Sequence, residues 1–203
     1  MDFPYLYRVM TDLLQKYSAD DSVSSVILVR GDELEYFRRG DEGVFVPDCR
    51  GCVYVGKNGY GKNREGDLKT PVGEFRAVTA FGVRPDPGTE LPYIAVTGST
   101  VACDSEGPWY NRIVDVSKLS EGSMCKGERM IDLVPEYNYG IALDYNPDNV
   151  YPLGSAIFFH CKGAKTWTGG CVAVDEEMMK HILLTCGQHP LVCIRPAEEE
   201  SPL

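Results

Sequence analysis

The sequence predicts a mainly β protein with one longer helix near each end of a single domain. Short runs rich in β-branched and aromatic residues, such as "SSVILVR" at 24–30 and "LVCIRP" at 191–196, alternate with turn residues along most of the chain. The 21 Gly and 13 Pro among 203 residues favour short strands over a helical bundle. Two segments show the spacing of an amphipathic helix.

Residues 1–22 contain the first of these helices, and we expect it to pack on the domain. Charged side chains interrupt every apolar run here, so the segment does not have the pattern of a secretory signal. No stretch of the chain approaches the eighteen apolar residues of a transmembrane helix. The domain itself is predicted at 23–197, followed by a frayed tail at 198–203. The helical spacing is that of Leu6, Val9, Met10, Leu13, Leu14 and Tyr17.

Strands separated by turns are predicted along the rest of the domain. They fall at 24–30, 33–37, 43–46, 52–56, 75–83, 93–98, 139–146, 154–160 and 191–196. Residues 56–75 are rich in Gly, Asn, Asp and Lys, which predicts a long loop. Residues 103–130 mix polar and turn residues, so we expect an irregular excursion or lid with one short helix.

The second helix is predicted at 175–187. Asp175 is placed as its N-cap and Gly187 as its stop. One face carries Met178, Ile182 and Leu183.

The charge balance excludes two classes of partner. With 30 acidic against 20 basic residues the net charge is −10. Such a surface repels phosphate groups, and the chain has no Lys/Arg run, so nucleic acid and anionic membrane surfaces are not expected as partners.

Eight cysteines are present, and most need no special explanation. The chain is too large to require a disulfide scaffold, and Cys193 in "LVCIRP" is expected in the core. Cys49 and Cys52 form a CxxC that could be half a zinc site, a redox pair or two thiols at a hairpin turn. No second CxxC or close pair of histidines completes a four-ligand set, so no metal site is predicted.

The segment "FFHCKGAKTWTGGCVAV" at 158–174 holds the candidate catalytic pair. His160 ends an apolar strand, and Cys171 follows it by eleven residues, a spacing that suits two neighbouring strands joined by a loop. A nucleophilic cysteine needs a nearby base or cation and partial exposure. From these residues an enzyme is expected to have a fast-alkylating Cys171 with a depressed pKa.

Two glycines precede Cys171, and they distinguish this pair from ordinary core residues. An isolated His and Cys in apolar strands are more often structural. Gly169 and Gly170, however, weaken a strand, so their presence directly before Cys171 suggests a functional cause. They allow a substrate carbonyl to approach the backbone, and the amides of Gly170 and Cys171 could point at a developing oxyanion.

The segment 154–183 resembles the active-site motif of the L,D-transpeptidase (YkuD domain) family. That motif has a histidine after an apolar strand, then Ser/Thr-x-Gly-Cys, then another apolar strand. Thr168, Gly169, Gly170 and Cys171 match it. About ninety residues upstream, "GKNGYGKNREGDLKTPVGEFRAVTAFG" looks like the family's "G(K/R)-x-G…DGKTP-x-G-x-F" signature. The matches span roughly residues 24–195.

The resemblance implies a β-sandwich-like catalytic domain with peripheral helices that acts on peptidoglycan stem peptides. Cys171 would be the nucleophile, His160 the base, Gly170 an oxyanion amide, and the carbonyl of Cys161 would orient the imidazole ring. A thioester formed on the cysteine would be resolved by an amine, which gives a 3→3 crosslink. Such chemistry requires neither metal nor organic cofactor.

Two alternatives to transpeptidation stay open. With water as the acceptor the same thioester chemistry gives an L,D-carboxypeptidase. A non-catalytic wall-binding domain would keep the fold, but it would have no need of an activated thiol. The family implies a location in the cell envelope, although no signal peptide is visible in this sequence. The oligomeric state is not predicted.

The chain departs from better-known members at two positions. Those members have arginine two residues after the cysteine, where this chain has Ala173, and many have histidine where it has Gly169. We predict that Lys162 or Lys165, in the loop between the motif residues, partly replaces the missing positive charge. The alternative is that both lysines are solvated.

Further substrate contacts are predicted around this loop. Thr168 and Gly169 belong to the matched motif. Trp167 is either a stacking wall for substrate or a loop anchor. Trp109 could line the opposite wall from the irregular excursion, which would suit a stem peptide with apolar stretches.

Overall fold

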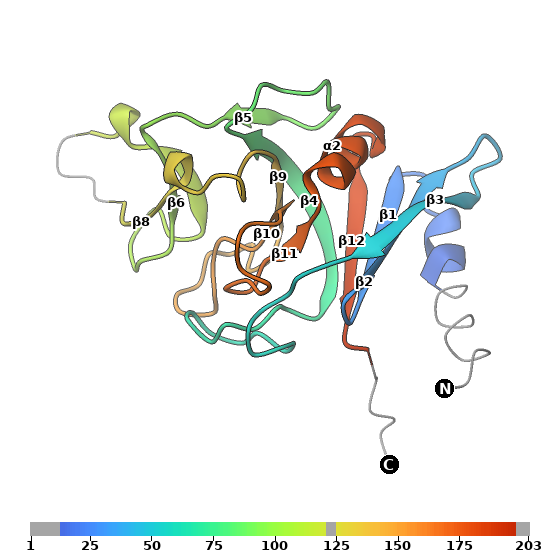
Figure 1. The fold of residues 1–203 in the computed structure, drawn as a ribbon, viewed down its shortest axis with the longest axis horizontal. Coiled ribbons are helices and arrows are strands. Elements are labelled where there is room, and N and C mark those ends of the chain that lie inside the picture. Colours follow the sequence, from blue (N-terminus) through green and yellow to red (C-terminus); the bar gives the residue numbers. More distant parts are fainter. Residues whose placement is uncertain (1–12, 121–124, 198–203) are drawn as a thin grey trace, which may run out of the picture.

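The computed structural model describes residues 13–120 and 125–197, and within them the fold is mainly β (Figure 1). Residues 13–18 are helical, α2 spans Glu176–Thr185, and two 3₁₀ turns lie at Val116–Lys118 (η1) and Met130–Asp132 (η2). The strands are β1 (Ser25–Arg30), β2 (Glu33–Arg39), β3 (Phe45–Cys52), β4 (Gly73–Gly82), β5 (Tyr93–Ala95), β6 (Thr100–Cys103), β7 (Arg112–Asp115), β8 (Gly127–Arg129), β9 (Gly140–Leu143), β10 (Phe158–Cys161), β11 (Val172–Val174) and β12 (Pro190–Arg195).

Strand β4 joins the two halves of the main sheet. The strand order is β11-β10-β9-β4-β12-β1-β2-β3, with β5 also paired to β4. The first part of β4 pairs with β12 and the later part with β9, with a register shift between Ala77 and Thr79. Side chains from both halves, such as Ile27 and Phe159, pack with Ile182 of α2 in one buried cluster. The predicted mainly β, sandwich-like architecture with peripheral helices is confirmed.

Side chains that alternate along β1 pack into two separate cores on opposite faces of the sheet. In β1, Ile27 and Val29 belong to the main cluster, whereas Val26 and Leu28 belong to a second cluster on the other face. Leu13, Leu14 and Tyr17 of the helical segment 13–18 contact that second cluster. Leu13 and Leu14 are only partly buried, so each contributes less than the roughly 1.5–3 kcal/mol of a fully buried aliphatic side chain. The predicted helix therefore covers this face, as far as it can be followed; residues 1–12 and the predicted tail lie outside the described part.

Strand β3 corrects the sequence interpretation of the first hairpin. Two strands were expected, at 43–46 and 52–56, but β3 pairs with β2 over one continuous stretch. The chain then continues as isolated bridges from Tyr54 to Ala173 and from Gly56 to Thr168. Polar residues in the middle of β3 concealed this strand, because an edge strand has no need of a continuous apolar pattern.

Helix α2 starts and stops close to the predicted residues. Asp175 occupies the N-cap position, but its side chain makes no capping hydrogen bond and instead pairs with Lys162. Gly187 follows the helix with a φ of +70°, a conformation that favours glycine at a helix end. Met179, Ile182 and Leu183 are buried against the core, while Met178 is partly buried.

Residues 99–120 and 125–137 form a small lobe instead of an irregular excursion. It contains a three-stranded sheet in the order β7-β6-β8 and both 3₁₀ turns. A disulfide joins Cys103 to Cys125, next to a cluster that includes Val101, Val114 and Trp109. In Figure 1 this lobe lies on the opposite side of β9 and β10 from α2. No helix in the described ranges is long and apolar enough to cross a membrane.

We predict that Gly140→Ala destabilises the domain. Gly140 pairs with His160 across β9 and β10, and a Cβ added there would lie 2.4 Å from the nearest carbon of the buried Phe81 ring. Overpacking of this kind costs about 1–3 kcal/mol. Urea unfolding should show a lower midpoint than the parent. Gly98→Ala is the matched control, since a Cβ at Gly98 meets nothing within 4 Å. Equal midpoints for the two variants would contradict the packing argument.

Candidate active site

Alternation along β10 and β11 separates the core residues from the site residues. Phe159 and Cys161 point into the main core, whereas His160 lies between them on the other face and lines a pocket. Strand β11 runs parallel to β10, with Val172 opposite Phe159. Cys171 immediately precedes Val172 and lines the same pocket. The two motif residues therefore meet at one pocket, as the sequence predicted.

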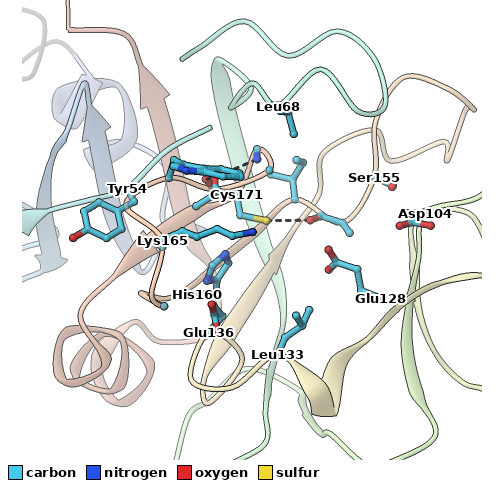
Figure 2. Close-up of a pocket in the computed structure, with 18 of the residues that line it drawn as sticks. Tyr54, Leu68, Asp104, Glu128, Leu133, Glu136, Ser155, His160, Lys165 and Cys171 are labelled. Atoms are coloured by element: carbon cyan, nitrogen blue, oxygen red, sulfur yellow. Dashed lines mark hydrogen bonds between the residues drawn. The ribbon is translucent and has the colours of Figure 1, made fainter. Parts of the chain in front are cut away.

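The pocket has a volume of about 320 Å³ and lies between the sheet and the lobe (Figure 2). One side is the motif loop, including Trp167, Thr168 and Gly169. The opposite side comes from the lobe and the segment after it, and the long loop at 62–68 closes a third. The lobe contributes Asp104, Glu128, Leu133, Glu136 and Tyr137, and the segment after it contributes Ser155, Ala156 and Ile157.

His160 is held in one tautomer by a backbone carbonyl. Its Nδ1 lies 2.7 Å from the oxygen of Cys161. A carbonyl oxygen can only accept a hydrogen bond, so Nδ1 carries the proton and Nε2 has a free lone pair. Burial lowers the pKa of His160, and the Cys161 carbonyl and Glu136 only oppose that shift. The ring is therefore neutral near neutral pH, as a general base requires.

The thiol of Cys171 is bound to backbone groups in the resting pocket. Its sulfur donates to the Ala156 carbonyl at 3.2 Å and accepts from the Phe158 amide at 3.3 Å. Burial raises the pKa of this thiol to about 12, although the Phe158 amide and Lys62 favour the thiolate. The expected depressed pKa is therefore wrong for the resting site. Figure 2 shows the sulfur facing the pocket interior.

Thr168 fixes the turn that presents the cysteine. Its hydroxyl donates to the Cys171 carbonyl at 2.6 Å and accepts from the Gly170 amide at 3.1 Å. The backbone of Thr168 is bonded to Val55 and Lys57. Because its amide is already engaged, Gly170 is not a free oxyanion donor in this state, contrary to the role that the motif implied.

Gly170 is required for a steric reason. Its φ of +145° is a conformation that side chains rarely adopt, and an added Cβ would lie 2.8 Å from the Lys69 carbonyl oxygen. The same Cβ would be 3.5 Å from Lys62 Nζ. The glycine thus lets the loop at 62–69 approach the cysteine. Gly169 is different, since a Cβ there meets nothing within 4 Å.

Lys62 is the buried cation of the site, and sequence reasoning missed it. Its side chain is only 2% exposed and its ammonium lies 3.0 Å from Asp67. Burial alone would raise the pKa of Asp67, but hydrogen bonds from the amides of Asn63, Lys69 and Arg64 and from Lys62 outweigh it and lower the pKa to about 2. The signal was present in the upstream motif "GKNREGDLKTP", where this Lys and Asp are five residues apart.

The lobe presents carboxylates to the pocket. Glu128 accepts a hydrogen bond from the Tyr137 hydroxyl at 2.7 Å, and its carboxylate points into the pocket in Figure 2. Burial raises the pKa of Glu128, while Tyr137 opposes the shift. The Tyr137 ring also packs edge-on against His160, with centroids 5.5 Å apart. Tyr137 therefore contacts both the Glu128 carboxylate and the His160 ring. Glu65 is held separately, by the hydroxyls of Tyr110 and Ser155.

The remaining predicted site residues divide between pocket and surroundings. Lys165 and Trp167 line the pocket, with the Lys165 ammonium 4.7 Å from the centre of the Trp167 ring. Lys162 is not among the lining residues, since its ammonium pairs with Asp175 at 3.1 Å and lies over Tyr54. Trp109, which was expected to line the opposite wall, is not among the lining residues either.

Trp109 packs in the lobe beside the disulfide instead of lining the pocket. Its indole N–H is buried and has no hydrogen-bond partner among the described residues. Its neighbour Tyr110 is also buried, but its hydroxyl reaches Glu65 and so connects the lobe to the loop at 62–68.

Comparison with known proteins gives a family match over most of the chain. A model of the L,D-transpeptidase catalytic domain, YkuD, matches residues 24–188. A search of curated proteins finds no match. Among solved structures, a point mutant of the helical cell shape determining protein Pgp2 from Campylobacter jejuni is 18% identical, with a TM-score of 0.51 over 88% of this chain and 49% of that one.

Two further structures share lower similarity. Pgp2 without that mutation gives 17% identity and a TM-score of 0.49 over 93% of this chain and 56% of that one. L,D-transpeptidase 1 from Mycobacterium tuberculosis gives 13% and 0.40 over 85% and 62%. The chain spans about half the length of the Pgp2 structures. The family model covers most of the sequence, and the chain belongs to the L,D-transpeptidase catalytic domain (YkuD) family.

Proposed function

We propose that this protein is a cysteine acyltransferase that crosslinks peptidoglycan stem peptides through a thioester on Cys171. The observation that carries the proposal is the shared pocket of Cys171 and His160, with His160 Nδ1 bound to the Cys161 carbonyl. That contact leaves Nε2 as the basic nitrogen at a pocket that also holds the thiol. A domain that only binds wall peptides has no need of such an arrangement.

The raised thiol pKa determines how acylation proceeds. Because the thiol is neutral at rest, His160 Nε2 takes its proton as sulfur attacks the carbonyl carbon of the donor stem peptide. The tetrahedral intermediate then collapses, the carbon–nitrogen bond breaks, and the proton on His160 passes to the leaving amine of the terminal residue. The product is a thioester, with the terminal amino acid released.

Lys62 is the group that we assign to charge stabilisation in this step. It is buried, it favours the thiolate of Cys171, and it lies beside Gly170. A fixed cation in a pocket shielded from water stabilises a developing oxyanion more strongly than a solvated one. Lys165, on the pocket wall, remains a second candidate.

The acidic side of the pocket suits the second half of the reaction. An amine acceptor arrives as an ammonium and must lose a proton before it attacks the thioester. Carboxylates such as Glu128 and Asp104 favour a positively charged group there. Once the ammonium has lost a proton to water, its nitrogen attacks the thioester carbon. Neutral His160 takes the second proton from that nitrogen and passes it to the sulfur as the carbon–sulfur bond breaks, which releases the new amide and the Cys171 thiol. This side therefore favours an amine over water as the acceptor.

The cell envelope is the proposed location. The Cys103–Cys125 disulfide is a bond that persists in oxidising compartments, and it lies in the lobe that forms one side of the pocket. The substrate proposed from the family is found outside the cytoplasmic membrane.

The function is tested by incubating the protein with a tetrapeptide muropeptide and separating the products by mass spectrometry. A crosslinked dimer that lacks one terminal amino acid is expected, whereas hydrolysis would give only a shortened monomer. Cys171→Ala should abolish turnover. His160→Gln should reduce it by about 10²–10⁴-fold, the usual contribution of a general base.

Cys52→Ser is the matched control, because Cys52 is an exposed thiol that does not line the pocket. Turnover that survives Cys171→Ala, or a wild-type protein that produces neither product, would overturn the proposed function. A shortened monomer alone would replace transpeptidase by carboxypeptidase.

Thiol reactivity should report the neutral resting state. With a pKa of about 12, Cys171 is mostly protonated up to about pH 10. Its rate of alkylation by iodoacetamide should rise by about tenfold per pH unit over that range, because only the thiolate reacts. The measurement is peptide mass spectrometry after timed labelling, with Cys52 as internal reference. A plateau below about pH 8 would mean that a thiolate already exists at rest.

The identity of the supporting cation is tested with two double variants. Lys62→Met with Asp67→Asn removes the buried pair without leaving an unpaired charge. We expect it to lower kcat/KM by about 10²-fold or more, the scale of losing one oxyanion-stabilising group. Lys162→Ala with Lys165→Ala should lower it much less, since these lysines are outside the pocket or at its wall. A larger loss in the second variant would assign the charge stabilisation to Lys162 or Lys165 instead of Lys62.

A further inference from the structure

The CxxC of Cys49 and Cys52 is not a redox pair in this fold. Both residues lie in β3, three positions apart, so their side chains leave opposite faces of the strand about 10 Å apart along it. A disulfide needs Cα atoms within about 7 Å. Cys49 packs against the main core, whereas Cys52 is exposed. Any special role of the motif therefore belongs to one of the two cysteines.

A β-bulge brings Asp48 to the same place as Cys49. The ladder between β2 and β3 pairs Tyr36 with Cys49 and Phe37 with Pro47, which leaves Asp48 as the extra residue. Neighbouring residues of a regular strand face opposite ways, but a bulge re-aims a side chain. Here both consecutive side chains present a metal-binding atom to a single point.

Helix α2 supplies a third group at that point. The helix packs closely on β3, because a Cβ on Gly51 would lie 2.5 Å from the Met178 side chain. His181, one helical turn later, places Nε2 2.5 Å from Asp48 Oδ1. The carboxylate of Asp48, the sulfur of Cys49 and the imidazole of His181 all have ligand atoms within 4.8 Å of one another.

This donor set has the chemistry of a zinc site. Zinc binds thiolate sulfur at about 2.3 Å and imidazole nitrogen or carboxylate oxygen at about 2.0–2.2 Å, in tetrahedral geometry. Ligand atoms around one ion then lie about 3.3–3.8 Å apart, by the same geometry. The present cluster reaches that spacing with small side-chain movements, chiefly a widening between Asp48 and His181.

Surrounding residues orient two of the three donors. Arg38 Nε donates to Asp48 Oδ2, so the other oxygen, Oδ1, faces His181. The Tyr36 ring packs edge-on against the His181 ring, with centroids 6.3 Å apart. Partners of this kind hold ligands in position at metal sites. The Asp48 side chain is almost fully buried, whereas that of His181 is 45% exposed, which leaves an open side for water.

We propose that Asp48, Cys49 and His181 bind one Zn²⁺ ion, with water as the fourth ligand. The ion would tie β3, the last strand in the sheet order, to helix α2. Because α2 follows β11 directly, the same link would steady the strand that begins after Cys171. The site lies outside the pocket lining, so this inference does not depend on the proposed acyl transfer.

The test is titration with Co²⁺, whose bond to a thiolate gives a charge-transfer absorption, followed by displacement with Zn²⁺. The full chain should carry Cys171→Ser, so that the pocket thiol cannot compete. One equivalent of Co²⁺ should produce the band, and Cys49→Ser should remove it. Asp48→Asn and His181→Gln should weaken binding by at least about tenfold, since even residues outside the ligand set cost about 10–100-fold.

Cys52→Ser and His189→Gln are the matched controls, as an exposed thiol and an exposed imidazole outside the cluster. Both should bind like the parent. The proposal is overturned if no band forms, if the band survives Cys49→Ser, or if Cys52→Ser removes it. It is also overturned if zinc raises the melting temperature of the parent and of His181→Gln equally.

Discussion

The hydrogen bond from His160 Nδ1–H to the Cys161 carbonyl is the interaction on which the rest of the site depends. It requires no other side chain, since the acceptor is the peptide group next in the chain. The amide of Cys161 donates to the Glu136 carbonyl and its thiol is buried in the main core, so the acceptor itself is fixed. The imidazole therefore presents the same basic nitrogen to the pocket with a backbone carbonyl, and not a carboxylate, as the hydrogen-bond partner of Nδ1.

The same two strands build the core and position the chemistry. Phe159 and Val172 anchor β10 and β11 in the main core, and strand alternation then turns His160 outward while Cys171 enters the pocket at the start of β11. Stability and reactivity are therefore coupled at this point. A substitution that disturbs the core packing beneath β10 is therefore expected to displace His160 as well.

Local pattern was enough to predict most strands of the main sheet, helix α2 and the His160–Cys171 pair, because apolar runs and motif spacing report on neighbours along the chain. It did not predict β3 correctly, nor the strands of the lobe, where polar and turn residues interrupt the apolar pattern. It could not predict Lys62, which reaches the cysteine only because the loop at 62–69 folds over Gly170. The raised pKa of Cys171 was missed for a related reason, since burial depends on the lobe that covers the pocket. The bulge at Asp48 likewise arises from pairing with β2, which no local pattern records.

The most direct test of this account is nuclear magnetic resonance of protein with ¹⁵N-labelled histidine, because the nitrogen shifts distinguish the two neutral tautomers and the imidazolium. The chain has three histidines, and His160→Gln assigns the relevant signals. Near neutral pH we predict a neutral His160 ring with the proton on Nδ1 and an unprotonated Nε2. An Nε2–H tautomer, or an imidazolium paired with a Cys171 thiolate, would contradict it.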